Sequence, residues 1–195
     1  MPLIPGMILA GGLSRRMGGG DKCLLPLAGR PTLAHVIERI RPQVTALALN
    51  ANGDATRFVG FDLPVVADDA VDFAGPLAGI LAALDWARRM HPAASAVLTV
   101  PADTPFLPGD LAVRLAAAGA PAVAGSSGRI HPVVGLWPLA LEAGLRKALR
   151  DEGLRKVEDW TARLQPAVVD FAAAPVDPFF NVNTPEDLVR AEALL

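Results

Sequence analysis

The residues best suited to chemistry lie in one glycine-rich segment near the amino terminus, LAGGLSRRMGGGDK at positions 9–22. Glycine lets a backbone adopt positive φ angles and approach a ligand closely, so that successive amide N–H groups can converge on anionic oxygens. Three cations, Arg15, Arg16 and Lys22, lie in the same segment, and both side-chain types make charge-assisted contacts with phosphate. The segment therefore predicts a phosphate-binding loop, although Arg15 can equally face solvent. A surface hairpin with solvated charges is the alternative, and it leaves the gathering of cations unexplained.

Two familiar kinds of phosphate loop do not match this segment. A Walker A loop has Gly-Lys followed by Ser or Thr, whereas Lys22 follows Asp21 and precedes Cys23. A dinucleotide-binding fingerprint opens a helix at once, whereas the next helical pattern here begins only near Pro31. The pattern indicates a longer and more cationic loop than either, and it disfavours a nicotinamide-dependent oxidoreductase.

Strand and helix patterns alternate along the chain. Short apolar runs predict strands near 7–9, 44–50, 63–67, 96–100, 120–124, 131–137 and 167–171. Helical patterns cover 30–41, 75–90, 108–119, 138–153 and 184–195, and Thr184 is placed to cap the last of these helices. Such alternation is typical of an open, largely parallel α/β sheet, in which ligands bind at loops that follow the carboxyl ends of strands. The glycine-rich segment is one such loop.

Composition limits the class of protein. The chain has 195 residues, 52% of them hydrophobic, and a mean hydropathy of +0.37, which suits a single domain with a full core. A net charge of -2 does not indicate a nucleic-acid or membrane partner. One cysteine and three scattered histidines exclude an internal disulfide framework and a zinc-ligand spacing. No apolar run approaches the ~18 residues of a membrane span, so we expect a soluble, cytoplasmic protein.

Further motifs follow the glycine-rich segment in a characteristic order. They are LAGRP (27–31), NAN (50–52), DDAVDFAGPLAGI (68–80), PADTPFLP (101–108), RIHPVVGL (129–136) and FFNVNTPEDL (179–188). Segment 9–22 itself resembles the LAGGxSxRMGxxDK pattern of nucleotidyltransferases, and the whole set resembles the molybdenum cofactor guanylyltransferase family. The resemblance implies a three-layer α/β/α, Rossmann-like nucleotidyltransferase fold in one domain, residues 1–195. It also implies a nucleotide-binding part in 1–105 and a pterin-binding part in 106–195.

The resemblance implies a definite reaction. Members of the family transfer GMP from GTP to the terminal phosphate of molybdopterin or its molybdenum-loaded form, and pyrophosphate leaves. The attacking phosphate is already ionised, so that charge neutralisation and in-line alignment matter more than a general base. Carried onto this chain, the catalytic residues are Arg16, Lys22 and Asp103. Asp103 follows the apolar run at 96–101 and is the expected Mg²⁺ ligand, since Mg²⁺ prefers oxygen donors. Its alternative role is to turn the chain before Thr104 and Pro105.

The expected GTP site draws on several parts of the chain. Its residues are Leu9, Ala10, Gly11, Gly12, Arg16, Gly18, Lys22, Asn50, Asp68 and Asp103. Related cytidylyltransferases carry LAAG where this chain has LAGG, so that Gly11 favours guanine. Guanine presents N–H donors, which Asp68, Asn50 or the carbonyls of Leu9 and Ala10 can accept. A strand-end turn for Asn50 and a solvated Asp68 are the alternatives.

The expected pterin site lies in the second half of the chain. Asn181 and Asn183 stand at alternate positions before the last helix, where their amides can both donate and accept hydrogen bonds. Arg155 and Lys156 are weaker candidates for the same site. For the two asparagines the alternative is capping before Thr184, and for Arg155 and Lys156 it is a solvated helix start.

Other conspicuous side chains have structural interpretations. Cys23 is expected in the core, His131 is expected to be a satisfied hydrogen-bond partner, and the three tryptophans are expected to pack.

The sequence leaves three rival functions open. They are a cytidylyltransferase of the same cofactor, a sugar-phosphate nucleotidyltransferase, and a non-catalytic carrier of GTP or cofactor. Transient contact with cofactor-biosynthesis proteins or recipient molybdoenzymes is a further expectation.

Overall fold

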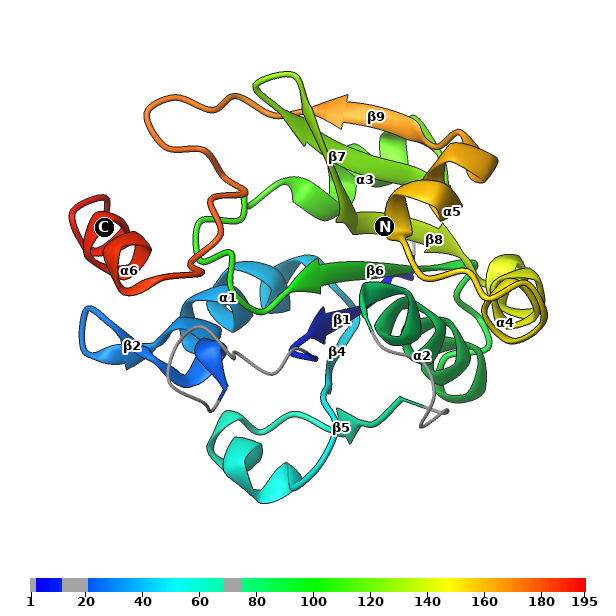
Figure 1. Ribbon diagram of the computed structural model, residues 1–195, viewed down its shortest axis with the longest axis horizontal. Coiled ribbons are helices and arrows are strands. Elements are labelled where there is room, and N and C mark those ends of the chain that lie inside the picture. Colours follow the sequence, from blue (N-terminus) through cyan, green and yellow to red (C-terminus); the bar gives the residue numbers. More distant parts are fainter. Residues whose placement is uncertain (1–2, 12–20, 69–74) are drawn as a thin grey trace.

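A seven-stranded, mostly parallel sheet forms the centre of the protein (Figure 1). The computed structural model describes residues 3–11, 21–68 and 75–195. The strand order is β5-β4-β1-β6-β8-β7-β9, and only β8 runs against its neighbours. The strands are β1 (Pro5–Leu9), β4 (Ala46–Asn50), β5 (Val65–Val66), β6 (Ala96–Pro101), β7 (Ala122–Ser126), β8 (Arg129–Pro138) and β9 (Ala167–Asp170).

Helices cover both faces of the sheet and complete three layers. They are α1 (Thr32–Ile40), α2 (Pro76–Met90), α3 (Leu111–Ala118), α4 (Glu142–Asp151), α5 (Val157–Leu164) and α6 (Pro185–Glu192). Alternate residues of a strand face opposite ways, so that Ile8 packs with α1 and α3 while Met7 packs with α2, α4 and α5. Both side chains are fully buried. The open, largely parallel α/β sheet expected from the alternating pattern and the three-layer α/β/α fold that the resemblance implies are both confirmed.

The strand register brings the carboxyl ends of four parallel strands to one edge. Leu9, the last residue of β1, pairs with Asn50 of β4 and with Pro101 of β6, and Asn50 pairs in turn with Val66 of β5. We call this the carboxyl edge. The loops that leave it carry Gly11, Asn52, Asp68 and Asp103. The fold therefore gathers at one edge residues that are widely separated in the sequence.

The end of the chain returns to this edge. Thr184 and Asp187 form a capping box at the start of α6, as the sequence predicted for Thr184. Figure 1 shows α6 beside the hairpin of β2 (Pro26–Leu27) and β3 (Arg30–Pro31), and the two elements are in contact. This packing, with the hydrogen bond from Lys22 to Asn183, places the segment before α6 next to residues 22–31.

All seven predicted strands and all five predicted helices are present. Helix α5, the β2–β3 hairpin and four short 3₁₀ helices were not predicted: η1 (Lys22–Leu24), η2 (Arg41–Gln43), η3 (Ala55–Phe61) and η4 (Leu139–Leu141). Within the described ranges, no helix combines the length and the apolarity that crossing a bilayer requires.

Candidate active site

Two adjoining hollows open at the carboxyl edge, and both are lined by Leu9, Ala10 and Gly11. The smaller hollow, about 160 Å³, also has Lys22 and Asp103 in its wall. The larger, about 460 Å³, is lined further by Asn50, Asn52, Asp68, Arg57 and Gly79, among others. We call them the lysine hollow and the asparagine hollow. Their shared wall means that one elongated ligand can occupy both.

The lysine hollow brings a cation and a carboxylate together. Lys22 begins η1, and its Nζ donates a 2.8 Å hydrogen bond to Oδ1 of Asn183. Asp103 follows β6 and is half-buried. Burial raises the pKa of Asp103 to about 6, although Lys22 and a backbone hydrogen bond act in the opposite direction. The carboxylate is thus mostly ionised at neutral pH and poorly solvated, a state that a cationic ligand stabilises.

The C-terminal segment holds its place at this hollow through backbone contacts. The N–H of Val182 donates to the carbonyl of Asp103 at 2.9 Å. The N–H of Asn183 donates to Oδ2 of Asp187 at 3.1 Å, within the capping of α6. The helix cap therefore fixes the backbone of Asn183, and the side-chain amide of the same residue orients Lys22.

The asparagine hollow has an acceptor-rich wall. The Nδ2 of Asn50 donates to the carbonyl of Val66 at 3.1 Å and to Asp68 Oδ1 at 2.9 Å. Asn52 Nδ2 donates to Asp68 Oδ2 at 2.7 Å, and Asn52 Oδ1 accepts from the N–H of Asp68 at 2.8 Å. The Nδ2 atoms of Asn50 and Asn52 thus both donate to groups within the protein. The carboxylate of Asp68 and the Oδ1 of Asn50 remain able to accept.

Two glycines leave space around that Oδ1. A Cβ added at Gly79, in the first turn of α2, would lie 2.7 Å from Asn50 Oδ1, and one added at Gly11 would lie 3.8 Å from it. Asn50 is only 2% exposed, so that its side chain has little freedom to move away. Gly79 therefore keeps the amide of Asn50 accessible from the hollow.

Sequence reasoning missed several residues of these walls. Asn52, Gly79 and Arg57 line the asparagine hollow together with Asp21. Asn52 belongs to the motif NAN (50–52) and Gly79 to the motif at 68–80. Membership in the same motifs as Asn50 and Asp68 was a signal that could have added both residues to the predicted site. Arg57 comes from η3 and belongs to none of those motifs.

The remaining predicted residues are distributed differently. Asn181 is exposed, and Lys156 is exposed at the start of α5. Arg155 NH1 donates to the carbonyls of Leu149 and Leu154, and the backbone of Arg155 lies near Gly75 at the rim of the asparagine hollow. Gly12, Arg15, Arg16 and Gly18 lie outside the described residues.

The structural interpretations of conspicuous side chains are confirmed. Cys23 is buried, and burial, with the charges of Asp21 and Asp103, raises its pKa to about 12, so the thiol stays protonated. All three tryptophans are buried.

His131 also has the expected hydrogen-bond partner. It shares a 2.8 Å hydrogen bond with Ser126 Oγ, which also donates to Asp177 Oδ1 at 2.9 Å. Serine, not histidine, is central in this group, and Ser126 is only 1% exposed. The group of Ser126, His131 and Asp177 therefore lacks the arrangement of a hydrolytic triad, in which the histidine lies between the other two residues.

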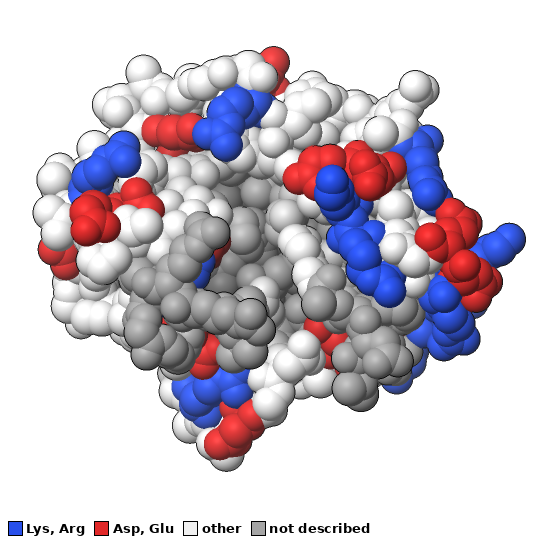
Figure 2. All heavy atoms as spheres, in the orientation of Figure 1, with Lys and Arg blue, Asp and Glu red and all other residues white. Residues whose placement is uncertain are grey.

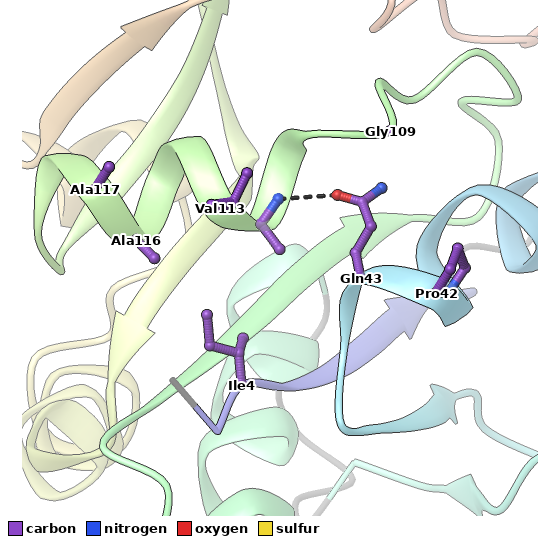
Figure 3. Close-up of a pocket in the computed structure, with 8 residues that line it drawn as sticks. Ile4, Pro42, Gln43, Gly109, Val113, Ala116 and Ala117 are labelled. Atoms are coloured by element: carbon purple, nitrogen blue, oxygen red, sulfur yellow. Dashed lines mark hydrogen bonds between the residues drawn. The ribbon is translucent and has the colours of Figure 1, made fainter. Parts of the chain in front are cut away.

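Other hollows lie away from the carboxyl edge. Figure 3 shows one of about 390 Å³ between Ile4, just before the amino end of β1, and helix α3. Its wall is largely apolar, and Gln43 Oε1 there accepts a 3.0 Å hydrogen bond from the N–H of Ala112. On the face shown in Figure 2, basic and acidic side chains of the described residues are interspersed, without the single-sign stripe that suits a nucleic-acid backbone.

Comparison with known proteins identifies the family to which the chain belongs. Residues 6–166 match the family described as the MobA-like NTP transferase domain. A molybdenum cofactor guanylyltransferase of Rhodopseudomonas palustris is 54% identical over 99% of this chain and 94% of its own length. The chain belongs to the MobA-like NTP transferase family. Another guanylyltransferase of this family, from Bradyrhizobium, is 55% identical over 98% of this chain and 92% of its own length.

Solved structures show the same fold. The MobA-like fold here is similar to molybdopterin-guanine dinucleotide biosynthesis protein A from Archaeoglobus fulgidus, with a TM-score of 0.72, 23% identity and 98% of both chains covered. It is also similar to a nucleotidyl transferase from Methanothermobacter, with a TM-score of 0.75, 21% identity, and 98% of this chain and 97% of that chain covered.

Proposed function

We propose that this protein transfers GMP from GTP to the terminal phosphate of molybdopterin or its molybdenum-loaded form and releases pyrophosphate. Family membership and relatives above half identity, which are named as guanylyltransferases of this cofactor, support the proposal. The observation that carries it is the joining of a hollow that holds Lys22 and Asp103 to one with an acceptor-rich wall. The first suits a triphosphate and the second suits a base with N–H donors.

The reaction needs little proton chemistry. An oxygen of the acceptor phosphate attacks the α-phosphorus of GTP, and the bond from that phosphorus to the bridging oxygen of pyrophosphate breaks. Both the nucleophile and the leaving group are anionic oxygens, so that the protein must mainly neutralise charge and align the groups in line. The Lys22 ammonium provides one positive charge, and Asn183 orients it through the 2.8 Å hydrogen bond. Arg16 is proposed as a second cation for the triphosphate.

The donor chemistry at Asp103 fits Mg²⁺. Mg²⁺ binds one or two protein carboxylates and completes its shell with phosphate oxygens and water. Asp103 presents one carboxylate that is desolvated and follows a strand at the hollow's wall. Within the described ranges no group of three or more candidate ligand residues occurs, so the proposal draws the other ligands from substrate phosphates and water. When bound, Mg²⁺ would neutralise phosphate charge beside Asp103.

Base selection follows from the acceptors in the asparagine hollow. The N1–H and N2–H₂ donors of guanine are adjacent, and the same wall offers two acceptors, Asn50 Oδ1 and the Asp68 carboxylate that accepts from Asn50 Nδ2. Cytosine presents only its 4-amino group as a donor on this edge, next to acceptors that would oppose these oxygens. The wall therefore favours GTP over CTP. Leu9, Ala10, Gly11, Gly12 and Gly18 are proposed to approach the nucleotide through backbone.

The acceptor phosphate and its pterin are assigned to the C-terminal side of the lysine hollow. Asn183 already lies there, and we extend the proposal to its neighbour Asn181. Arg155, whose backbone lies at the rim of the asparagine hollow, and the adjacent Lys156 are proposed as further pterin contacts from that side. This keeps residues 1–105 mainly for the nucleotide and 106–195 mainly for the pterin. Protein partners that supply or receive the cofactor belong to the same proposal.

Turnover of matched variants tests this function. The wild-type chain with GTP, Mg²⁺ and a molybdopterin phosphate should release pyrophosphate and form a guanine dinucleotide, and CTP should compete poorly. Asp103→Asn and Lys22→Ala should each lower kcat by at least about a hundredfold, since the first removes the proposed Mg²⁺ ligand and the second removes a cation at the reacting phosphates. Intrinsic tryptophan fluorescence and thermal unfolding should stay close to wild type. Variants that turn over normally would contradict the assignment of the lysine hollow.

A further inference from the structure

Arg57 joins two loops of the asparagine hollow. Its NH2 donates to the carbonyl of Asn52 at 2.6 Å, and its NH1 donates to the carbonyl of Asp54. Its Nε lies 2.5 Å from Oδ2 of Asp21, an ion pair whose N–H is not aligned as a hydrogen bond. One guanidinium thus contacts the loop after β4 and the residue that directly precedes Lys22.

The partner carboxylate lies where a nucleotide would feel its charge. Asp21 and Arg57 both line the asparagine hollow, and their side chains are 18% and 28% exposed. Solvent therefore screens their interaction only partly. An unpaired carboxylate in this wall would repel a bound triphosphate, and it would also compete with the phosphates for Lys22. Pairing with Arg57 removes that negative charge from the site.

We infer that Arg57 is a positioning residue for nucleotide binding, which neutralises Asp21 and fixes the end of the glycine-rich segment against the Asn52 loop. This inference rests on the proposed function, because it treats the asparagine hollow as the nucleotide site. Arg57 acts through Asp21 and through the Asn52 carbonyl, so that its loss affects how tightly GTP binds more than how fast the bound nucleotide reacts. The charge of Asp21 is the source of the effect.

A purely structural role for Arg57 makes a different prediction. Arg57 lies inside η3, and its contacts with Asn52 and Asp54 could serve only to hold that short helix. Arg41 offers a matched control, since its NH2 donates to the carbonyl of Phe61 at the other end of η3, at 3.2 Å. Arg41 does not line either hollow. Loss of η3 stability should therefore follow from either arginine, whereas an effect of Asp21 charge should follow only from Arg57.

Four variants test the inference: Arg57→Gln, Asp21→Asn, the double variant and Arg41→Gln. Arg57→Gln should raise the KM for GTP on the order of tenfold, with a smaller change in kcat, because a carboxylate is left unpaired. Asp21→Asn should raise KM by less than about fivefold, as for loss of a partly exposed ion pair. The double variant should recover much of the affinity that Arg57→Gln loses, since it carries no unpaired carboxylate. Arg41→Gln should match wild type in its KM for GTP, even where it lowers the stability of η3.

Two results would overturn the inference. One is a KM for Arg57→Gln equal to that of wild type, and the other is a double variant as weak as the product of the two single effects. Equilibrium binding of GTP, with thermal unfolding of each variant, separates affinity from folding. If Arg57→Gln does not fold, Arg57→Lys keeps the positive charge and should retain most of the affinity; a tenfold loss there would refute the charge effect. Wild-type protein that binds GTP but transfers nothing would contradict the proposed function and leave this test intact.

Discussion

Replacing Gly79 by alanine adds one methyl group at the most crowded point of the asparagine hollow. The new Cβ would lie 2.7 Å from Asn50 Oδ1 and 3.2 Å from a terminal methyl of Leu9. Asn50 is held by hydrogen bonds of 3.1 and 2.9 Å to Val66 and Asp68, so that it can yield only by breaking one of them. Overpacking of this kind costs about 1–3 kcal/mol. The same methyl group blocks the approach of the base to Asn50 Oδ1, and a buried donor left without its acceptor costs about 1–3 kcal/mol of binding, a rise of about 5- to 150-fold in the Kd for GTP.

Stability should respond less than affinity, because alanine is favoured over glycine in a helix by about 1 kcal/mol and offsets part of the strain. Titration calorimetry with GTP, alongside thermal unfolding, measures both quantities. Gly144→Ala is the matched control, since Gly144 lies in the first turn of α4 and its added Cβ would meet nothing closer than Trp160 at 3.9 Å. That variant should be as stable as wild type or more stable, and it should bind GTP normally. If Gly79→Ala bound GTP as tightly as wild type, the role given to Asn50 would be wrong.

Two other perturbations address the lysine hollow and the α2–α4 contact. Asn183→Ala removes the 2.8 Å partner of Lys22 and should lower kcat/KM by about tenfold in a pyrophosphate-release assay; unchanged kinetics would show that Lys22 needs no such orientation. Burial opposes ionisation of Glu142, but hydrogen bonds from Arg146 and Arg88 outweigh it and hold the Glu142 pKa below its ordinary 4.5. The ionised group therefore stabilises the fold above pH 4.5 and loses that effect as pH falls through the lower folded-state pKa. Glu142→Gln should cost about 1 kcal/mol of unfolding free energy at pH 7, and the deficit should shrink in urea titrations below pH 4.5; a pH-independent deficit would contradict this.

The main elements could be predicted because each carries its own periodicity. The apolar run before Asp103 and the punctuated helix after Gly75 are local signals, and both elements form where expected. Helix α5 was missed although Val157 and Trp160 are spaced to face the core. It has only eight residues, and three of them are charged, so that the apolar signal is weak.

The candidate site could be predicted from the sequence in part. Asp103 was predicted from its place after a strand, since carboxyl ends of parallel strands share an edge, whereas Asn50 and Asp68 came from the family resemblance. The pairing of Lys22 with Asn183 spans 161 positions, and no local pattern reports it. Arg57 reaches Asp21 from a 3₁₀ helix whose place depends on the surrounding fold. Such contacts come from tertiary packing, and they are the ones that sequence reasoning left out.

The position of the bound nucleotide tests the central claim most directly. A crystal structure of this protein with Mg²⁺ and a non-hydrolysable GTP analogue should place the base in the asparagine hollow, within hydrogen-bond distance of Asn50 Oδ1 or Asp68. The phosphates should extend to Lys22 and Asp103. A nucleotide bound away from the carboxyl edge, or one with its phosphates remote from Lys22, would contradict the account.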